Sequence, residues 1–255
     1  MIIIISIAIG LVVGSFLNVV ILRADQGESL GGRSRCDSCR KTLSAGELIP
    51  IVSFVIQKAR CRSCGIALSW QYPLVESATA AGYGAAAWIL APDITAISAY
   101  APGLAVAFIG IAALVVILVA DFRFQIIPDG AAVALLIAGI AVSAMRHSFF
   151  PDAAAGFAIA LFFAALWFFS RGRWMGLGDA KLILATSLAT GFPASIAGFV
   201  FSFWIGGASA LPLLLFGGKS MHSRIPFGPF IIAGAAAAYF FSDYFFRAAG
   251  LSLLW

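Results

Sequence analysis

Residues 101–121 read APGLAVAFIGIAALVVILVAD, a run of twenty apolar residues that ends at an aspartate. A run of about 17–25 apolar residues is long enough to cross a lipid bilayer as a helix. The rest of the chain has the same character, since 62% of its 255 residues are hydrophobic, only 11% are charged, and the mean hydropathy is +1.03. Soluble domains carry roughly 25% charged residues, so the composition indicates an integral membrane protein.

The apolar runs predict an all-α polytopic membrane protein with about eight transmembrane helices. They are continuous and lack the period-two alternation of a membrane barrel. The run at 180–192 is the shortest, and with its neighbour it could form a re-entrant hairpin instead of two crossings. Four isoleucines follow Met1 with no basic segment before them, so we expect the first run to be retained and not cleaved as a signal peptide. The expected spans are residues 2–22, 72–91, 101–120, 130–145, 153–170, 180–192, 194–216 and 228–247.

Lysine and arginine residues gather on one side of this predicted topology. Fourteen of the sixteen fall on the side of residues 23–71, which leaves only Arg146 and Arg247 opposite. The positive-inside rule assigns the rich side to the cytoplasm, which places both chain ends on the outer side. Basic loops at a membrane suit anionic lipid head groups, so this charge predicts contact with lipid and not with nucleic acid. The fourteen are Arg23, Arg33, Arg35, Arg40, Lys41, Lys58, Arg60, Arg62, Arg123, Arg171, Arg173, Lys181, Lys219 and Arg224.

All four cysteines lie in the one long polar segment, as two Cys-x-x-Cys pairs with 21 residues between them. Thiolate pairs at about this spacing are typical of a tetrahedral zinc site, and a cytoplasmic position disfavours disulfides. Four thiolates leave no open position for a catalytic water, so we expect a structural zinc that folds the loop. Free thiols or a redox pair are the alternative. The expected ligands are Cys36, Cys39, Cys61 and Cys64.

Asp121 and Asp179 each lie where an apolar run meets a basic segment, at the predicted cytoplasmic boundary. A carboxylate at the edge of a membrane helix is costly and is therefore a candidate functional residue. Two carboxylates held close together cannot both ionise, so one can take a proton from water while the other hydrogen-bonds a scissile carbonyl. Gly176 and Gly178 lack side chains and would let an extended substrate backbone approach. These residues predict an intramembrane aspartyl protease.

The predicted domains are a first transmembrane helix at 1–22, a zinc-binding loop at 23–71, and a membrane aspartyl protease domain at 72–255. Asn18, in the first run, is expected to join helices through its buried amide. Glu76, at the start of the second run, is expected to pair with a nearby arginine and not to act in catalysis.

Other interpretations of the two aspartates remain open on the sequence alone. Asp121 could be a solvated helix-end residue neutralised by Arg123, and Asp179 could be a helix N-cap. The pair could also handle protons in a transporter whose cysteine loop has a regulatory role. Serine and zinc protease chemistry are not favoured. A serine protease in the membrane would need a histidine or lysine beside its serine, and intramembrane basic residues are lacking. The chain has only two histidines, and neither lies in a His-Glu-x-x-His motif.

Seven ordered segments of the chain carry a resemblance to a known family. They are residues 14–20 (GSFLNVV), the two cysteine pairs with Ile49-Pro50 between them, residues 60–65 (RCRSCG), 72–76 (YPLVE), Asp121 with 127–129 (IPD), 176–182 (GLGDAKL) and 226–230 (PFGPF). Over nearly its whole length the chain resembles the prepilin peptidase (type IV leader peptidase) family, intramembrane aspartyl proteases of the Gly-x-Gly-Asp class.

The resemblance implies a bacterial inner-membrane enzyme of eight spans with Asp121 and Asp179 as its catalytic pair. It implies cleavage of the short basic leader of type IV prepilins or type II secretion pseudopilins, after a glycine and at the cytoplasmic face. It further implies N-methylation of the new N-terminus from S-adenosylmethionine, an activity linked to the cysteine loop. Glu47 stands where relatives often carry Asp, and Arg40 replaces a usual glycine, which could loosen the zinc knuckle. A pilus assembly factor without enzymatic activity is a further alternative.

Overall fold

The computed structural model describes residues 1–91, 97–215 and 226–250 and forms two compact units, Met1–Val116 and Ile117–Trp255. Within the described ranges the chain is helical, with two isolated β-bridges and no strand, which confirms the predicted all-α class. Lys219, Arg224 and the last residue of the expected span 194–216 lie outside the described residues.

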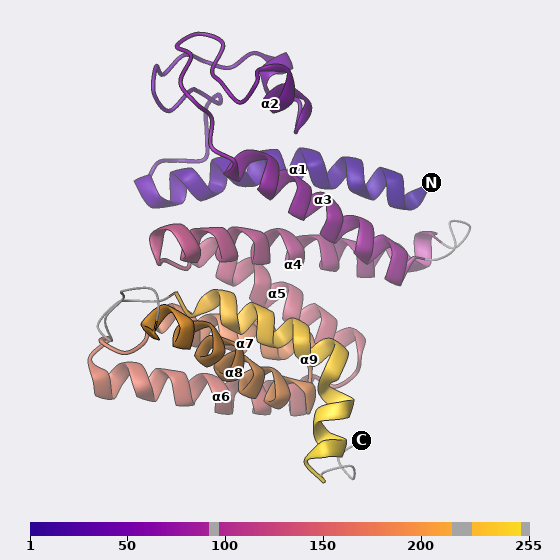
Figure 1. Cartoon of the computed structure of the whole chain (residues 1–255). Coiled ribbons are helices and arrows are strands. Elements are labelled where there is room, and N and C mark those ends of the chain that lie inside the picture. Colours follow the sequence, from indigo (N-terminus) through magenta and orange to yellow (C-terminus); the bar gives the residue numbers. More distant parts are fainter. Residues whose placement is uncertain (92–96, 216–225, 251–255) are drawn as a thin grey trace. The chain divides into compact units, whose positions relative to one another are not determined.

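The first unit is built on two long helices, α1 (Ile2–Gln26) and α3 (Gln71–Leu90), which pack along each other (Figure 1). Gly10 and Gly14, one helical turn apart on α1, allow this close approach. A Cβ on Gly10 would lie 2.6 Å from the Cα of Ala80, and one on Gly14 would lie 2.7 Å from the Cα of Glu76. A pair of glycines four residues apart is a common contact between membrane helices, because it brings two backbones together.

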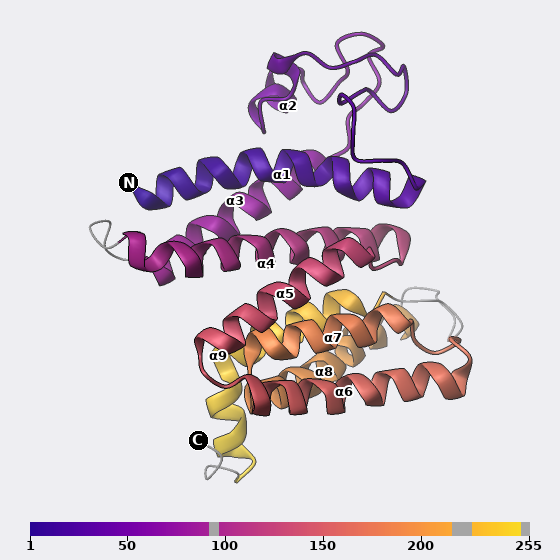
Figure 2. The same ribbon diagram turned by 180° about the vertical axis from the view of Figure 1, so that it is seen from behind.

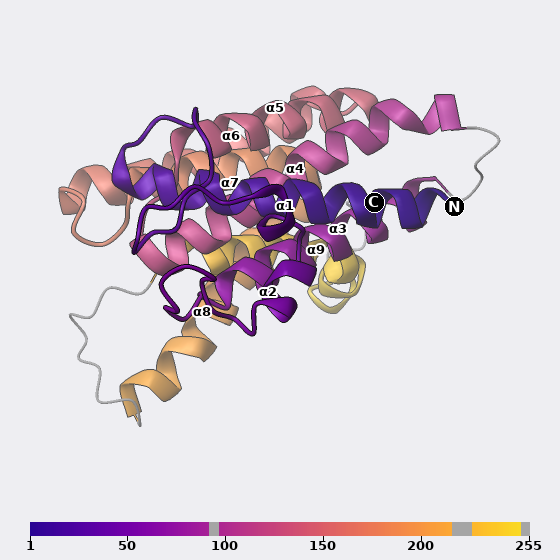
Figure 3. The same cartoon turned by 90° about the horizontal axis from the view of Figure 1, so that it is seen from above.

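The segment between α1 and α3 contains only a short 3₁₀ turn, η1 (Ala45–Glu47), and a short helix, α2 (Val52–Ile56). It lies over the α1–α3 pair (Figure 1, Figure 3). The backbone amide and hydroxyl of Ser44 both donate to Glu47 at the start of η1, at 2.9 and 2.8 Å. Glu47 therefore has a local capping function, which a shorter aspartate could also provide.

Helix α4 (Ile97–Phe124) belongs to both units, since the boundary between them falls at Val116. Its first half packs on α3 through a small apolar cluster that includes Ala87 and Leu104. The rings of Tyr83 and Phe108 are stacked with centroids 4.0 Å apart, and the Tyr83 hydroxyl donates to the carbonyl of Phe108 at 3.0 Å. Its last turn, in the second unit, carries Asp121.

The second unit continues with five helices: α5 (Asp129–Met145), α6 (Phe149–Ser170), α7 (Leu177–Thr190), α8 (Ala194–Leu215) and α9 (Gly228–Ala248). Helix α7 is short and contacts the other four (Figure 2). Glycines on its neighbours make room for it: a Cβ on Gly139 of α5 would lie 2.7 Å from the carbonyl oxygen of Ala185. Because α7 is enclosed by protein, its length is not set by the thickness of a bilayer.

The C-terminal end of α7 is capped by a side chain from outside the helix. The guanidinium of Arg146 donates to the carbonyls of Leu188 and Ala189, each at 2.8 Å, and also pairs with Asp152 at 3.0 Å. Asp152 is fully buried and accepts hydrogen bonds from Ser143 and Ser148, at 2.6 and 2.7 Å. This cation near a helix C-terminus satisfies carbonyls that have no partner within the helix.

Each expected span coincides with a helix, but the helices differ in length and polarity. Five described helices are long and apolar enough to cross a membrane: α1, α4, α6, α8 and α9. Helix α5 is apolar and shorter, α7 has only 14 residues, and α3 has 20 residues but is less apolar than the five. A multi-pass helical protein is therefore confirmed, and the number eight stays a prediction.

Candidate functional site

Asp121 lies in the last turn of α4 with only 6% of its surface exposed. The backbone amide of Gly228, the first residue of α9, donates a hydrogen bond to its Oδ2 at 2.9 Å. Free amides at a helix N-terminus favour a negative charge. A Cβ on Gly228 would lie 2.6 Å from the same oxygen, so this position admits only glycine without movement of the carboxylate.

An aromatic cluster holds the start of α9 in place. Phe227 precedes Gly228, and its ring centroid lies 5.9 Å from that of Phe163 on α6 and 5.2 Å from that of Phe203 on α8. Phe163 is fully buried. Contacts of this kind between aromatic rings add to the stability gained from burial. The cluster therefore fixes the amide that faces Asp121.

Asp179 lies in the first turn of α7 and is 8% exposed. Its Oδ2 accepts a hydrogen bond from the backbone amide of Gly176, which has an extended conformation just before the helix, at 3.1 Å. A Cβ on Gly178 would come within 3.1 Å of the Cβ of Ile127, so Gly178 allows the turn to pack closely on the segment before α5.

The fold brings the two sequence-predicted aspartates into the same unit, close enough for the charge of Asp121 to act on the Asp179 carboxyl. Both are buried, which rules out the alternative of a solvated helix-end residue at Asp121. Asp179 is the third residue of its helix and not the N-cap, which is Gly176. Nearby, Lys181 pairs with Asp129 at 2.7 Å, and both side chains are well exposed. Lys181 is thus engaged by Asp129, and the charged neighbour of the Asp179 carboxyl is Asp121.

The four cysteines form a second cluster, in the first unit, whose sulfurs all lie within 4.8 Å of one another. The sulfurs of Cys36 and Cys64, one from each pair, are 4.0 Å apart. Four sulfurs arranged tetrahedrally around zinc at about 2.3 Å would be about 3.8 Å from each other. The donor set and its spacing therefore fit one tetrahedral metal ion with a full coordination shell.

Two hairpins with the same hydrogen bonds carry these pairs. In each, the first cysteine's amide donates to the carbonyl five residues later, and its carbonyl accepts from the amide four residues later. That fourth residue has a positive φ in both hairpins, 59° at Arg40 and 72° at Gly65. Both hairpins read Arg-Cys-x-Ser-Cys, at residues 35–39 and 60–64, so the likeness is one of sequence as well as of structure. The structure also shows that Arg40 adopts the turn that a glycine would adopt more easily.

Backbone amides prepare at least one thiolate in this cluster. The amides of Cys64 and Ser63 donate to the sulfur of Cys61 and lower its pKa to about 6. The amide of Lys41 also lowers the pKa of Cys39, but desolvation and the neighbouring thiols outweigh it and raise that pKa to about 11. Without a cation the four sulfurs compete for one negative charge, whereas a bound metal ion would stabilise all four thiolates.

Two comparisons with known proteins found sequences similar to this chain. The profile of the "Bacterial Peptidase A24 N-terminal domain" matches residues 8–90, and that of the "Type IV leader peptidase family" matches residues 108–211. The chain is 33% identical to "Prepilin leader peptidase/N-methyltransferase" of Bacillus subtilis (strain 168), over 92% of each chain. It is 31% identical to the protein of that name from Burkholderia pseudomallei (strain 1026b), over 96% of this chain and 87% of that one. No solved structure matches it.

The chain belongs to the type IV leader peptidase family. The sequence of this peptidase predicted the aspartates and the cysteines as site residues, but it indicated no role for Gly228. The segment PFGPF at residues 226–230, which is part of the family resemblance, contains this glycine. Its meaning requires the fold, because residue 228 lies 107 positions from Asp121 along the chain.

Two further polar residues of the peptidase differ in how far the sequence anticipated them. The amide of Asn18 on α1 donates to the carbonyl of Tyr72 at 3.2 Å, which confirms that it joins α1 to α3. Glu76 was expected to pair with an arginine, and that expectation was wrong. Its Oε2 accepts the backbone amide of Ile51 at 2.7 Å, and the Ser15 side chain supplies a second hydrogen bond.

Proposed function

We propose that this protein is a prepilin leader peptidase in which Asp121 and Asp179 are the catalytic pair. The observation that carries the proposal is the burial of both carboxyls in one unit, where each faces a backbone amide and the charge of one acts on the other. Family membership supplies the reaction, since relatives over most of the chain are named prepilin leader peptidase/N-methyltransferase.

In the proposed mechanism one carboxyl is ionised and the other is protonated. The ionised group takes a proton from a water molecule, whose oxygen attacks the scissile carbonyl carbon. The protonated group donates a hydrogen bond to the carbonyl oxygen, and the leaving nitrogen receives a proton as the peptide bond breaks. The amide of Gly228 stabilises charge on Asp121, and that of Gly176 stabilises charge on Asp179. Gly176 and Gly178 are proposed to let the extended substrate backbone approach the pair.

The substrates we propose are type IV prepilins or type II secretion pseudopilins, cut after a glycine at the end of a basic leader. The proposed topology is eight spans in the bacterial inner membrane, with both termini periplasmic and the site at the cytoplasmic face. We keep the division into a first helix (1–22), a zinc loop (23–71) and a protease domain (72–255). The positive-inside distribution supports this orientation.

The cysteine cluster is proposed to hold a structural zinc through Cys36, Cys39, Cys61 and Cys64. Bound there, zinc would fold the polar loop but would supply no open coordination position for chemistry. S-adenosylmethionine is proposed as the methyl donor for the N-methylation that the relatives' names include. The comparisons give no support to a proton-coupled transporter or to a non-enzymatic assembly factor.

The test is incubation of the purified protein with a synthetic prepilin peptide that spans the leader and the first half of the apolar helix. Mass spectrometry should show two products that separate after the leader glycine, and a mass increase of one methyl group on the larger product when S-adenosylmethionine is present. A peptide with a bulky residue in place of that glycine is the matched control and should remain intact. An unchanged wild-type peptide, with the enzyme shown to be folded, would exclude the proposed function.

A further inference from the structure

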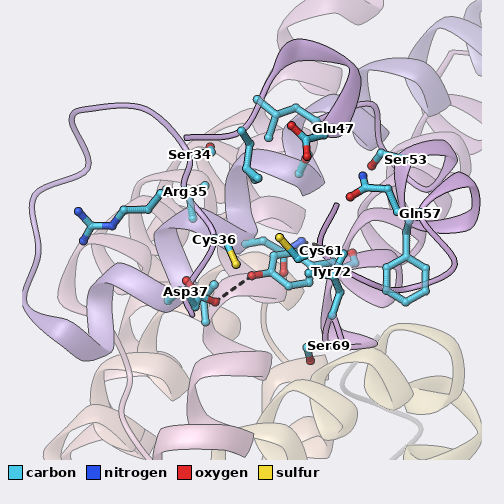
Figure 4. Close-up of a pocket in the computed structure, with 18 of the residues that line it drawn as sticks. Ser34, Arg35, Cys36, Asp37, Glu47, Ser53, Gln57, Cys61, Ser69 and Tyr72 are labelled. Atoms are coloured by element: carbon cyan, nitrogen blue, oxygen red, sulfur yellow. Dashed lines mark hydrogen bonds between the residues drawn. The ribbon is translucent and has the colours of Figure 1, made fainter. Parts of the chain in front are cut away.

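The first unit contains a cavity of about 520 Å³ between the α1–α3 pair and the cysteine loop (Figure 4). It is lined by residues of α1 and α3, among them Ser15, Asn18 and Glu76, and by residues of the loop, among them Cys36 and Cys61. Pockets of about 300–1,000 Å³ hold small organic ligands. The catalytic aspartates belong to the other unit, so the proposed peptidase mechanism does not use this space.

The polar groups on the cavity wall are held in fixed positions. Asn18 donates to Gly14 and Tyr72 carbonyls and accepts from the Gln71 amide, with all three distances between 3.2 and 3.3 Å. The Tyr72 hydroxyl donates to Asp37 at 3.1 Å, which ties α3 to the first cysteine hairpin (Figure 4). A site whose polar groups are already ordered loses less entropy when a ligand binds.

Glu76 is the most deeply buried carboxylate of this wall, with 5% of its surface exposed. Its partners among the described residues, the Ile51 amide and the Ser15 side chain, are neutral. Two of the three arginines that line the cavity are used elsewhere: Arg23 donates to backbone carbonyls, and one guanidinium nitrogen of Arg35 donates to both carboxylate oxygens of Glu28. The third is Arg40, in the first cysteine hairpin, and no hydrogen bond joins it to Glu76. A buried carboxylate without a cationic partner favours a ligand that carries positive charge.

We propose that this cavity is the binding site of S-adenosylmethionine, with Glu76 facing the cationic part of the ligand; the proposal rests on the N-methyltransferase part of the proposed function. The donor combines a sulfonium cation, an ammonium group and a flat aromatic base. The cavity offers a buried carboxylate for the cation and the rings of Phe16, Phe54 and Tyr72 for the base. In the transfer, the lone pair of the substrate amine forms a bond to the methyl carbon. The carbon–sulfur bond breaks, sulfur keeps its electron pair, and the amine nitrogen loses one proton to water.

This assignment has a consequence for product release. The donor loses its sulfonium charge when it becomes S-adenosylhomocysteine, whose sulfur is a neutral thioether. The attraction of Glu76 for the sulfonium is lost at that step, so the cavity should bind the donor more tightly than the product. An isosteric Glu76→Gln change should therefore raise the Kd of the donor by about tenfold and that of the product by less than about twofold.

A pair of matched tryptophan variants tests the cavity itself. Ser53 and Val55 lie on the same short helix, α2, but Ser53 lines the cavity whereas Val55 does not and is 66% exposed. Ser53→Trp should fill the cavity and abolish donor binding, while Val55→Trp should leave it unchanged. Binding is measured by equilibrium dialysis of radiolabelled S-adenosylmethionine against the full-length, zinc-loaded protein in detergent. Leader cleavage, measured in parallel, reports the folded state of the other unit.

The outcomes separate this proposal from the proposed function. Loss of donor binding in Ser53→Trp alone, with leader cleavage retained in both variants, supports the cavity. The proposal is overturned if Ser53→Trp binds the donor as tightly as the wild type does. It is also overturned if Glu76→Gln has the same donor Kd as the exposed control Asp243→Asn. A third outcome also overturns the proposal: the wild type retains phosphatidylethanolamine in place of the donor, and Ser53→Trp loses this lipid. The cavity would then be a lipid site. A wild type that binds the donor but cleaves no prepilin would contradict the peptidase proposal and leave the cavity supported.

Discussion

Gly228 has no side chain, yet it determines the surroundings of a proposed catalytic group. Its amide donates to Asp121, and a Cβ at this position would lie 2.6 Å from the carboxylate oxygen. The aromatic ring of Phe227 anchors the same turn between α6 and α8. The position of one backbone amide therefore affects the Asp121 carboxylate as much as a neighbouring acidic side chain does.

We predict that Gly228→Ala lowers the rate of leader cleavage by roughly 100-fold, because displacement of a reacting group by about 1 Å can cost that much. The measurement is kcat on a prepilin peptide. Gly207→Ala in α8 is the control, since a Cβ there meets no atom within 4 Å and should have little effect. Equal rates for the two variants would show that Asp121 does not depend on this contact.

Arg40 is a second residue whose backbone matters more than its side chain. A non-glycine residue in the left-handed region costs on the order of 1 kcal/mol, part of which is offset by the greater freedom of glycine in the unfolded chain. We predict that Arg40→Gly slows the release of zinc to a chromogenic chelator by a few-fold. Arg62→Gly, at a position without a positive φ, should instead accelerate release. The opposite order of rates would contradict the turn geometry.

At the scale of elements, α7 is the helix on which the second unit is organised. It is short, enclosed by four other helices, carries Asp179 in its first turn and is capped at its other end by Arg146. Arg146 is one of the two basic residues that the predicted topology places away from the cytoplasm. Its position is explained by this cap and by its pair with the buried Asp152.

We predict that Arg146→Met destabilises the protein by about 3 kcal/mol, because it leaves the buried charge of Asp152 without its partner. The measurement is the free energy of unfolding in detergent. The double variant Arg146→Met with Asp152→Asn should recover much of this loss, because the buried charge is then also removed. If the double variant is as unstable as the sum of the two single variants, the two residues do not act as a pair.

At the scale of the whole molecule, the groups proposed for methylation and those proposed for peptide cleavage lie in different units. The cysteine cluster and the cavity belong to Met1–Val116, and the aspartate pair belongs to Ile117–Trp255. Each unit has its own packed contacts, so loss of structure in one need not unfold the other.

We therefore predict that Cys36→Ser releases zinc and abolishes donor binding and methylation before it affects leader cleavage. Metal analysis, dialysis of S-adenosylmethionine and mass spectrometry of the peptide would follow the three properties in one preparation. Zinc-free wild-type protein that still binds the donor normally would separate the metal from the cavity. Simultaneous loss of cleavage and methylation would show that the units are coupled.

The sequence predicted the helical class, the position of each apolar segment, the cysteine cluster and the two aspartates. These properties depend on composition, on local spacing and on charge at the ends of apolar runs. It did not predict that Gly228 faces Asp121, that Glu76 bonds the Ile51 amide, or that Arg146 caps α7. Those contacts join residues 107, 25 and 42 positions apart, and no local pattern encodes such pairings. The sequence also left open whether residues 180–192 cross the membrane, because a helix that is enclosed by protein need not have the length of a membrane span.

The central claim is that Asp121 and Asp179 act together on a water molecule. The most direct measurement is leader cleavage by Asp121→Asn and Asp179→Asn, each purified and compared with wild type by mass spectrometry, with thermal unfolding as the control for folding. We predict that each variant remains folded and retains less than about 1% of wild-type activity, because members of a catalytic unit fail together. Substantial cleavage by either folded variant would contradict the account.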